Sequence, residues 1–433
     1  MTNGLTKKHS IKKDAVYVYA AHFLKYLGPL VLIPYYSRVL GPEGYGQVLA
    51  ALSLMTMINV IVNFGFWFSG IREVASVHGA EKYGEVLGRQ ILGRALMVPI
   101  GIVAGVLGTY FSPLLRDNCW FGVLATLLGI LTAFGLSWFF QGLRQFKKSI
   151  VFETIIYPMN IIFILLLVRG PEDGLLALVG LLLSNSLSLG ISYIYVRREA
   201  LPKFPSLMVG LREIRDTSLF FVTSMSFTVL TIGSTYILSI MASPHEVGYY
   251  GTAERFISVA IALLTPISQV LMPSITHHRK EDPERADSLM RKGLLLETSY
   301  GLTALAGGAL LAPFVIPLFL GSSFLPTVGI FQAMLAVLPF VAIKHAIVLY
   351  VLIPRHKDKH YLSVALFNVI VNLAVALALV PTMGAIGMAY ARCAAEISAT
   401  VLLFVLLWRT GLLKALWPVG NRPRAAISDS SGD

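Results

Sequence analysis

The chain has 433 residues, of which 56% are hydrophobic and only 13% are charged. A soluble protein carries roughly 25% charged residues, so this composition excludes a soluble globular protein and indicates an integral membrane protein. The formal net charge of +12 raises the question of nucleic-acid binding. No polar stretch is long enough to form a basic folded domain outside the membrane, so we expect no nucleic-acid partner.

Apolar stretches of about 20 residues, the length that crosses a bilayer core of about 30 Å, recur along the chain. They are continuously apolar rather than alternating, which favours helices over the strands of a barrel. We therefore expect an all-α integral membrane protein with about twelve transmembrane helices. The predicted spans lie near residues 15–39, 46–69, 91–111, 119–140, 150–168, 174–196, 217–241, 249–275, 293–319, 328–352, 361–380 and 384–408.

The lysines and arginines fall unevenly on the two sides of these predicted spans. Of the 35, 28 lie at or beyond one end of the spans, 3 lie at or beyond the other and 4 lie deep inside spans. This count assigns Arg94, at the start of span 91–111, to the basic connection before it, and Arg38, at the end of span 15–39, to the opposite side. Because the excess marks the cytoplasmic side, we expect both the N- and the C-terminus in the cytoplasm. The connections on the opposite side are short, such as 112–118 and 321–327. They leave little scaffold for an active site, so we expect a transporter and not an enzyme.

Two turns on the predicted outer side resemble each other. Residues 41–46 read GPEGYG and residues 244–251 read PHEVGYYG. Both place a proline, an acidic residue and a Gly-Tyr step at the start of a helix, where proline and glycine suit a tight turn. At matching positions in two halves, they indicate parallel repeats, although chance similarity is the alternative. The chain then divides into a six-helix bundle over 1–205, a pseudo-symmetric six-helix bundle over 206–415 and a polar cytoplasmic tail over 416–433.

Four prolines lie inside predicted spans: Pro29, Pro34, Pro266 and Pro339. Each removes a backbone hydrogen-bond donor and is a candidate bend point. Bent helices in both halves would suit a transporter that alternates between two open states.

Four cations lie deep inside predicted spans: Lys25, Arg255, Lys344 and Arg392. A charge in hydrocarbon is costly, so such residues usually face a water-filled cavity or a partner. Lys25 and Lys344 have no carboxylate within one helical turn, whereas Arg392 has Glu396 four residues later on the same face, where a local ion pair is an alternative. We predict that the four cations line a cavity for an anionic substrate, with snorkelling to the interface as the alternative.

Carboxylates in the same spans raise the possibility of ion coupling. Glu254 and Glu396 are candidate relays for a proton or sodium gradient, and the alternative is that each pairs with an arginine. Glu254 adjoins Arg255 but points roughly 100° away around the helix, so these two need not neutralise each other. Glu153 and Glu297 lie near inner span ends, where we expect them at the interface.

Further polar residues rank lower as pathway residues. The asparagines form two pairs at four-residue spacing, which would line a cavity or make interhelical hydrogen bonds. The histidines titrate near neutral pH, although a buried histidine is more often structural. These residues are His22, His345, Asn59, Asn63, Asn368 and Asn372. No GxxxxGK[ST] loop and no convincing metal-ligand cluster occur, so we expect no metal, no cofactor and no direct use of ATP.

Several motifs resemble the Wzx-type polysaccharide flippases. They are PYYSRVLGPEGYG at 34–46, FGF at 64–66 followed by REVA at 72–75, EVGYY at 246–250 and LMPS at 271–274. The resemblance implies the multidrug/oligosaccharidyl-lipid/polysaccharide exporter superfamily, whose members place two six-helix bundles around a central cavity. It also implies a multi-pass protein of the bacterial inner membrane that moves undecaprenyl-diphosphate-linked glycan, with a polysaccharide polymerase and chain-length machinery as possible partners.

We therefore expect a flippase that moves lipid-linked oligosaccharide repeat units from the inner to the outer leaflet by alternating access through the cationic cavity. One alternative is a cation-coupled multidrug exporter of the same superfamily, which would favour an acidic or apolar cavity. A second is a membrane glycan polymerase or ligase, which would need a long outer loop with catalytic residues.

Overall fold

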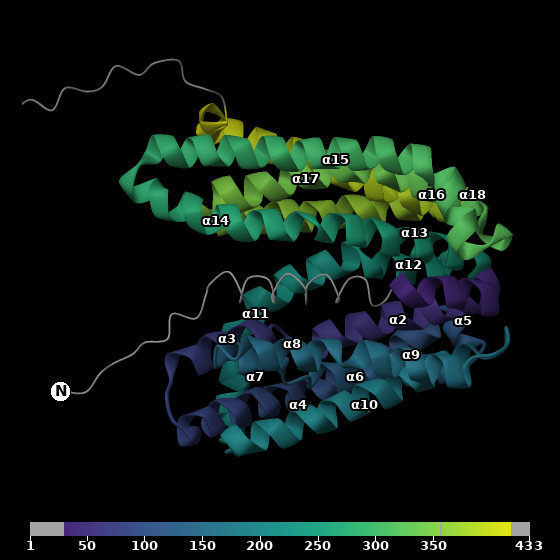
Figure 1. Ribbon diagram of the computed structural model, residues 1–433, viewed down its shortest axis with the longest axis horizontal. Coiled ribbons are helices and arrows are strands. Elements are labelled where there is room, and N and C mark those ends of the chain that lie inside the picture. The colour runs from purple at the N-terminus through teal and green to yellow at the C-terminus, as the bar shows by residue number, and fades with distance from the viewer. Residues whose placement is uncertain (1–29, 356, 417–433) are drawn as a thin grey trace, which may run out of the picture.

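The computed structural model describes residues 30–355 and 357–416, and within them every regular element is helical. The helices run roughly along one direction in two groups (Figure 1). The N-terminal group comprises α2–α10, the C-terminal group comprises α13–α18, and α11 and α12 lie between them. Lys25 and His22 lie outside the described residues.

The helices before the C-terminal group follow a helical segment at residues 30–39. They are α2 (Gly41–Asn63), α3 (Phe66–Ser76), α4 (Ala80–Phe111), α5 (Pro113–Arg116), α6 (Cys119–Ala133), α7 (Ser137–Gly142), α8 (Phe146–Thr154), α9 (Ile156–Leu167), α10 (Gly174–Glu199), α11 (Leu207–Leu230) and α12 (Ile232–Met241). Those of the C-terminal group are α13 (Pro244–Ala262), α14 (Leu264–Glu281), α15 (Pro283–Leu320), α16 (Pro326–Leu335), α17 (Val337–Ile347), the π-helix η2 (Val348–Leu352) and α18 (Asp358–Arg409). Short 3₁₀ turns η1 (Ser322–Phe324), η3 (Ile353–Arg355) and η4 (Leu412–Ala415) complete the described chain.

Three helix interruptions coincide with prolines. Pro158, Pro266 and Pro339 each lie three residues after the break between two helices, at α8–α9, α13–α14 and α16–α17 respectively. Proline removes one hydrogen bond and its ring crowds the carbonyl four residues earlier, which is the last residue of the preceding helix in each case. Helix breaks therefore coincide with Pro266 and Pro339, two of the four predicted bend points, whereas the helical segment at residues 30–39 continues through Pro34.

Nine helical stretches of the described residues are long and apolar enough to cross a membrane, or ten if α11 and α12 form one broken span bent by 56°. The 52-residue α18 exceeds one crossing, because at 1.5 Å per residue it would extend about 78 Å. Its backbone leaves helical geometry at Gly384 (φ 56°, ψ −131°), which separates two stretches of span length. The first predicted span lies mostly outside the described residues, so the number twelve stays a prediction.

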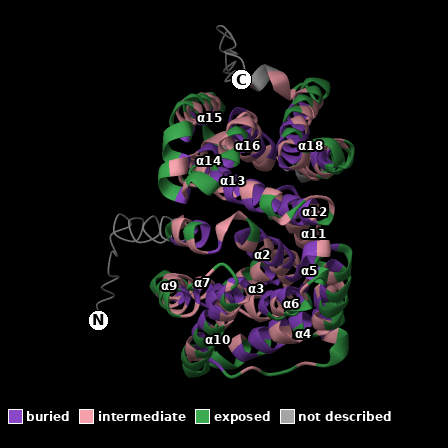
Figure 2. Ribbon diagram, turned by 90° about the vertical axis from the view of Figure 1, so that its right-hand side faces the viewer, coloured by how far each residue is buried: buried purple, intermediate pink, exposed green. Residues whose placement is uncertain are grey.

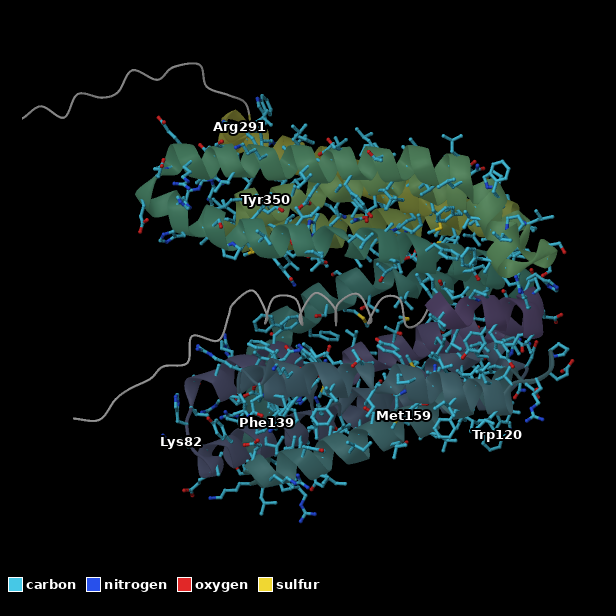
Figure 3. All side chains as sticks on the ribbon, in the orientation of Figure 1. Lys82, Trp120, Phe139, Met159, Arg291 and Tyr350 are labelled. Carbon is cyan, nitrogen blue, oxygen red and sulfur yellow. The ribbon has the colours of Figure 1, made fainter. Side chains whose placement is uncertain are left out.

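The two ends of the helix groups differ in charge. Figure 3 places Lys82 and Arg291 at one end, which we call the basic end, and Trp120 at the opposite end. Lys82 and Arg291 lie near the starts of α4 and α15, so these two basic segments share one side, as the uneven distribution of cations predicted. At the opposite end, the backbone N–H groups of Arg169 and Gly170 each donate to Asp173 over 2.8 Å and hold the pKa of its carboxyl below the ordinary value.

Buried residues face the interior of each group and exposed residues cover its outer surface (Figure 2). Many exposed residues are large and apolar, including Leu310 and Phe314 on α15, which are 74% and 75% exposed. A surface of this kind is stable against lipid hydrocarbon and not against water.

The two groups meet at the opposite end and diverge toward the basic end (Figure 1). A Cβ atom on Gly46 would lie 1.9 Å from the carbonyl oxygen of Pro244, and one on Gly248 would lie 2.2 Å from that of Pro42. Only glycine allows backbones to approach so closely. Because each turn presents the same glycine to the same proline of the other, the contact is reciprocal, as in an interface with twofold symmetry.

Candidate functional site

A cavity of about 480 Å³ lies between the two groups. Its walls come from residues 30–39, α2, α6, α9 and α10 on one side and from α12 and α13 on the other. Much of the lining is apolar. The polar and charged lining comprises Tyr36, Ser53, Thr56, Thr132, Tyr157, Asn160, Asn185, Thr235, Glu254, Arg255 and Ser258.

Arg255 is the one lysine or arginine that lines this cavity within the described residues. It forms no ion pair in residues 30–355 and 357–416, because the neighbouring Glu254 binds Arg392 instead. Consecutive residues of a helix differ by about 100° in direction, which is how Arg255 faces the cavity while Glu254, also at the cavity wall, reaches Arg392 of the C-terminal group. The cavity wall thus carries one positive charge that the described chain does not neutralise by an ion pair.

Asn160 lies on α9, in the N-terminal group, and lines the same cavity. Asn160 is only 8% exposed. Its amide oxygen has no hydrogen-bond partner in the described chain, although the Tyr36 side chain lies close by. A buried polar atom without a partner is costly, so a ligand or water is expected there. Sequence reasoning did not select Asn160, although an amide inside the apolar predicted span 150–168 was an available signal.

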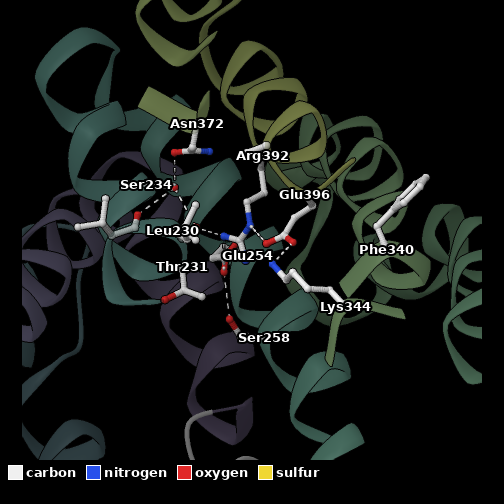
Figure 4. A network of polar contacts seen from close by, with 12 residues as sticks. Leu230, Thr231, Ser234, Glu254, Ser258, Phe340, Lys344, Asn372, Arg392 and Glu396 are labelled. Atoms are coloured by element: carbon white, nitrogen blue, oxygen red, sulfur yellow. Dashed lines mark hydrogen bonds and ion pairs between the residues drawn. The ribbon is translucent and has the colours of Figure 1, made fainter. Parts of the chain in front are cut away.

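The other cations and carboxylates form a buried network inside the C-terminal group (Figure 4). Arg392 Nη1 lies 3.5 Å from Glu254 Oε2, and Arg392 Nε lies 3.8 Å from Glu396 Oε1. Lys344 also forms an ion pair with Glu396, and Ser258 Oγ donates to Glu254 over 3.1 Å. Lys344 and Arg392 are therefore both paired, in contrast to Arg255.

Arg392 also donates a hydrogen bond to the backbone at the break between α11 and α12. At Thr231 the backbone adopts φ −93° and ψ −99°, which separates α11 from α12. The carbonyl of Leu230 accepts hydrogen bonds from Arg392 Nη1 and, over 3.1 Å, from Ser234 Oγ. A backbone carbonyl at membrane depth needs such partners because no water is available in hydrocarbon. Arg392 thus ties α18 to α13 and to the break between α11 and α12.

A second cavity of about 190 Å³ adjoins this network. Lys344, His345, Asn368, Arg392 and Glu396 contribute to its lining. The ion pair between Arg392 and Glu254 connects the walls of the two cavities, because Arg392 lines the second cavity and Glu254 lines the central one.

The remaining predicted asparagines make contacts between helices. Asn59 Nδ2 donates to Thr132 over 2.9 Å, Asn63 Oδ1 accepts from Arg94 over 3.1 Å, and Asn372 Oδ1 accepts from Ser234 over 3.4 Å. These are the interhelical hydrogen bonds that were the alternative to a cavity lining.

The N-terminal group holds a polar cluster that sequence reasoning missed. Arg94 is only 1% exposed, and its guanidinium donates to the Gln90 carbonyl over 3.0 Å and packs over the Trp138 ring. Gln90 and Ser69 each donate to Glu213 of α11 over 3.0 Å. Counting Arg94 with a basic connection was wrong, because the arginine lies buried within α4.

Glu297 on α15 is buried deeply rather than placed at an interface as expected. Its side chain has no exposed surface. Glu297 Oε2 lies 2.7 Å from His345 Nδ1, and Oε1 accepts from the Tyr350 hydroxyl. Within the described residues, no group of three or more His, Cys, Asp and Glu side chains could hold a metal ion.

Two family models each match more than half of the chain. A model described as "Polysaccharide biosynthesis protein" matches residues 11–278, and one described as "Lipid II flippase MurJ" matches residues 151–417. Proteins named "Putative O-antigen transporter" are 23% identical, one from Shigella dysenteriae over 92% of this chain and 99% of its own length, and one from Escherichia coli over 94% and 99%.

Two solved structures share the fold. The lipid II flippase MurJ in an inward closed conformation superposes with a TM-score of 0.68 at 17% identity, covering 93% of this chain and 89% of its own. An inward-facing multidrug resistance MATE family transporter of the MOP superfamily superposes with a TM-score of 0.62 at 15% identity, covering 91% and 98%.

Proposed function

We propose that this chain translocates undecaprenyl-diphosphate-linked oligosaccharide repeat units across the bacterial inner membrane. The chain belongs to the polysaccharide biosynthesis protein family and is a Wzx-type transporter of the multidrug/oligosaccharidyl-lipid/polysaccharide exporter superfamily. One observation carries the proposal: Arg255 lines the cavity between the two helix groups without an ion pair in the described chain. An anionic headgroup that enters the cavity is the partner this charge lacks.

The cavity lining suits both parts of a lipid-linked sugar. The guanidinium of Arg255 presents donors in a planar fork that matches phosphate, and we propose that Lys25, on the predicted first span, adds a second charge. Asn160 and Asn185 offer amide groups that pair with sugar hydroxyl and amide groups, while Tyr36 and Tyr157 offer aromatic faces. The prenyl tail would remain in lipid, where no polar site is required.

We further propose that the basic end faces the cytoplasm, as the excess of cations supports. The headgroup would enter where the two groups diverge and leave at the opposite end after the groups have rocked about each other. A polysaccharide polymerase and chain-length machinery would receive the product. No chemical step on the glycan is required of the chain itself.

Two alternatives fit less well. A cation-coupled drug exporter favours an acidic or apolar cavity. Much of this cavity is apolar, but the charge on its wall that has no ion pair in the described chain is the cation Arg255, and the carboxylate Glu254 is paired with Arg392. A glycan polymerase or ligase needs an extended outer surface, but the helices at the opposite end are joined by short connections such as Ser112 between α4 and α5. Glu254 and Glu396 are the candidate positions for coupling to a proton or sodium gradient. Both carboxylates form ion pairs with cations of the chain in this structure.

We expect Arg255→Gln to reduce export of the finished glycan at least about tenfold, because a charge-assisted hydrogen bond contributes about 1.5–3 kcal/mol and about 1.4 kcal/mol corresponds to a factor of ten. The measurement is surface glycan display in a deletion strain complemented with equal amounts of each variant. Arg255→Lys, which keeps the charge, should retain more display than Arg255→Gln. Arg116→Gln, an exposed charge removed at the opposite end, serves as the control. Full display with Arg255→Gln would contradict the proposed function.

A further inference from the structure

We propose that Glu297 and His345 form a proton-binding site in the C-terminal group, and that the loss or gain of its proton is linked to translocation. This inference rests on the proposed function and adds to it the position at which a proton acts. It replaces Glu254 and Glu396 as the expected positions for ion coupling.

Four glutamates are buried in the described residues, and three of them bind cations. Glu213 binds Arg89, Glu254 binds Arg392, and Glu396 binds Lys344 and Arg392. These three carboxylates therefore face side chains that carry a positive charge under ordinary conditions. The partners of Glu297 are an imidazole and a phenol, neither of which is permanently charged. Histidine is the side chain that ordinarily exchanges a proton near neutral pH. Among the four buried glutamates of the described residues, Glu297 is therefore the one whose partners suit a change of charge.

The backbone is distorted at the point that builds this site. His345 and Tyr350 are five residues apart, and in a regular α-helix they would point about 140° away from each other. The intervening chain enters the π-helix η2, in which Ile353 N–H bonds to the Val348 carbonyl. A π-helix has more residues per turn than an α-helix, so the entry into η2 brings residues five apart closer to one face; such a turn is rare and often found at functional sites. This local geometry lets both side chains reach the one carboxylate of Glu297.

The site has a route for protons. The His345 side chain is 25% exposed and lines the second cavity. That cavity, of about 190 Å³, has room for several water molecules at about 30 Å³ each. Protons can therefore reach the imidazole along water, although the carboxylate itself has no exposed surface.

The charges around the site connect it to the central cavity. The charged and titratable side chains that line the second cavity or bind its lining are Lys344 and His345 on α17, Tyr361, Arg392 and Glu396 on α18, and Glu254 on α13. Tyr350 on η2 binds Glu297 itself, and Tyr300 on α15 donates to the Ala260 carbonyl. From α14, the titratable residues 277–281 lie at the helix end, where Arg279 pairs with Asp287.

Lys344 and His345 are adjacent, so they point to different carboxylates, Glu396 and Glu297. When the site holds its proton, the imidazole and carboxylate together carry no net charge. Release of the proton leaves one uncompensated negative charge beside Lys344. That charge competes with Glu396 for Lys344. The change in turn weakens the ion pair between Arg392 and Glu254 at the cavity wall. The step is a proton transfer alone, with no bond formed or broken elsewhere.

The test measures the proton without the glycan. The full-length protein in proteoliposomes on a solid-supported membrane is exposed to a pH jump, and the transient charge displacement is recorded. We expect the wild type to displace charge, and Glu297→Gln and His345→Gln each to reduce the displacement at least about tenfold, because each removes a proton-exchanging member of the pair. The control His277→Gln, whose side chain is 65% exposed in wild type, should retain the full signal.

Monodisperse elution of each variant shows that it is folded, and the isosteric Glu297→Gln change makes this attainable. An unchanged displacement in both folded variants would overturn the inference, and so would lipid-linked glycan translocation that proceeds at the wild-type rate in Glu297→Gln. A lost displacement together with slowed translocation would support it. Wild-type protein that displaces charge but moves no lipid-linked glycan would contradict the proposed function instead.

Discussion

Arg392→Met is expected to lower the free energy of unfolding by about 3–5 kcal/mol, the cost of removing one partner of a buried ion pair. The change leaves the Glu254 carboxylate buried without its cation and removes a donor from the Leu230 carbonyl at the helix break. Both groups lie where little water can replace the guanidinium. The measurement is equilibrium unfolding of the purified protein in mixed detergent micelles, followed by tryptophan fluorescence.

The double variant Arg392→Met with Glu254→Leu separates this cause from general disruption. Because it removes both charges, we expect it to recover a large part of the lost stability. Arg409→Met, at an exposed helix end, should change stability by less than about 0.5 kcal/mol. A single Arg392→Met change as mild as this control would contradict the structural role assigned to the network.

Alanine at Gly46 or Gly248 should prevent closure of the opposite end. Each Cβ would enter a space already filled by a carbonyl oxygen of the other turn, at 1.9 Å and 2.2 Å. Because backbone atoms cannot yield as a flexible side chain does, we expect the two groups to separate there and translocation to fall at least about tenfold, a change of about 1.4 kcal/mol in a population or barrier.

The separation can be measured with spin labels at Trp120 and Leu325, which are exposed by 62% and 53% in the two groups. Labelling requires replacement of the free cysteines Cys119 and Cys393. Pulsed electron–electron double resonance should show longer distances between the two spin labels in Gly46→Ala and Gly248→Ala than in wild type. Gly190→Ala is the matched control, since its Cβ would meet nothing within 4 Å. Identical distance distributions in all four proteins would argue against the glycine contact as the closing point.

Much of the fold could be predicted from the sequence because the membrane imposes a simple rule. Spans follow from apolar runs of fixed length, and proline marks breaks such as those before Pro266 and Pro339. Arg255 could be selected because a charge within a span requires an explanation. Its separation from Glu254 followed from helix geometry alone.

The partners of the buried charges could not be predicted, because they come from helices distant in the chain. Lys344 has no carboxylate on its own helix and obtains Glu396 from α18. Residue spacing reports only neighbours on one helix, so Lys344 remained unpaired until the fold brought α17 and α18 together. Glu297 was misplaced for the same reason: its partners His345 and Tyr350 meet it only through the π-helix.

Movement of a diphosphate-linked glycan through the cavity that Arg255 lines can be measured in proteoliposomes that contain the purified protein and undecaprenyl-diphosphate-linked oligosaccharide. Outward movement is followed as exposure of the sugar to an added exoglycosidase. We expect translocation by the wild type and at least about tenfold slower translocation by Arg255→Gln. Translocation at the wild-type rate by Arg255→Gln would contradict the proposed function.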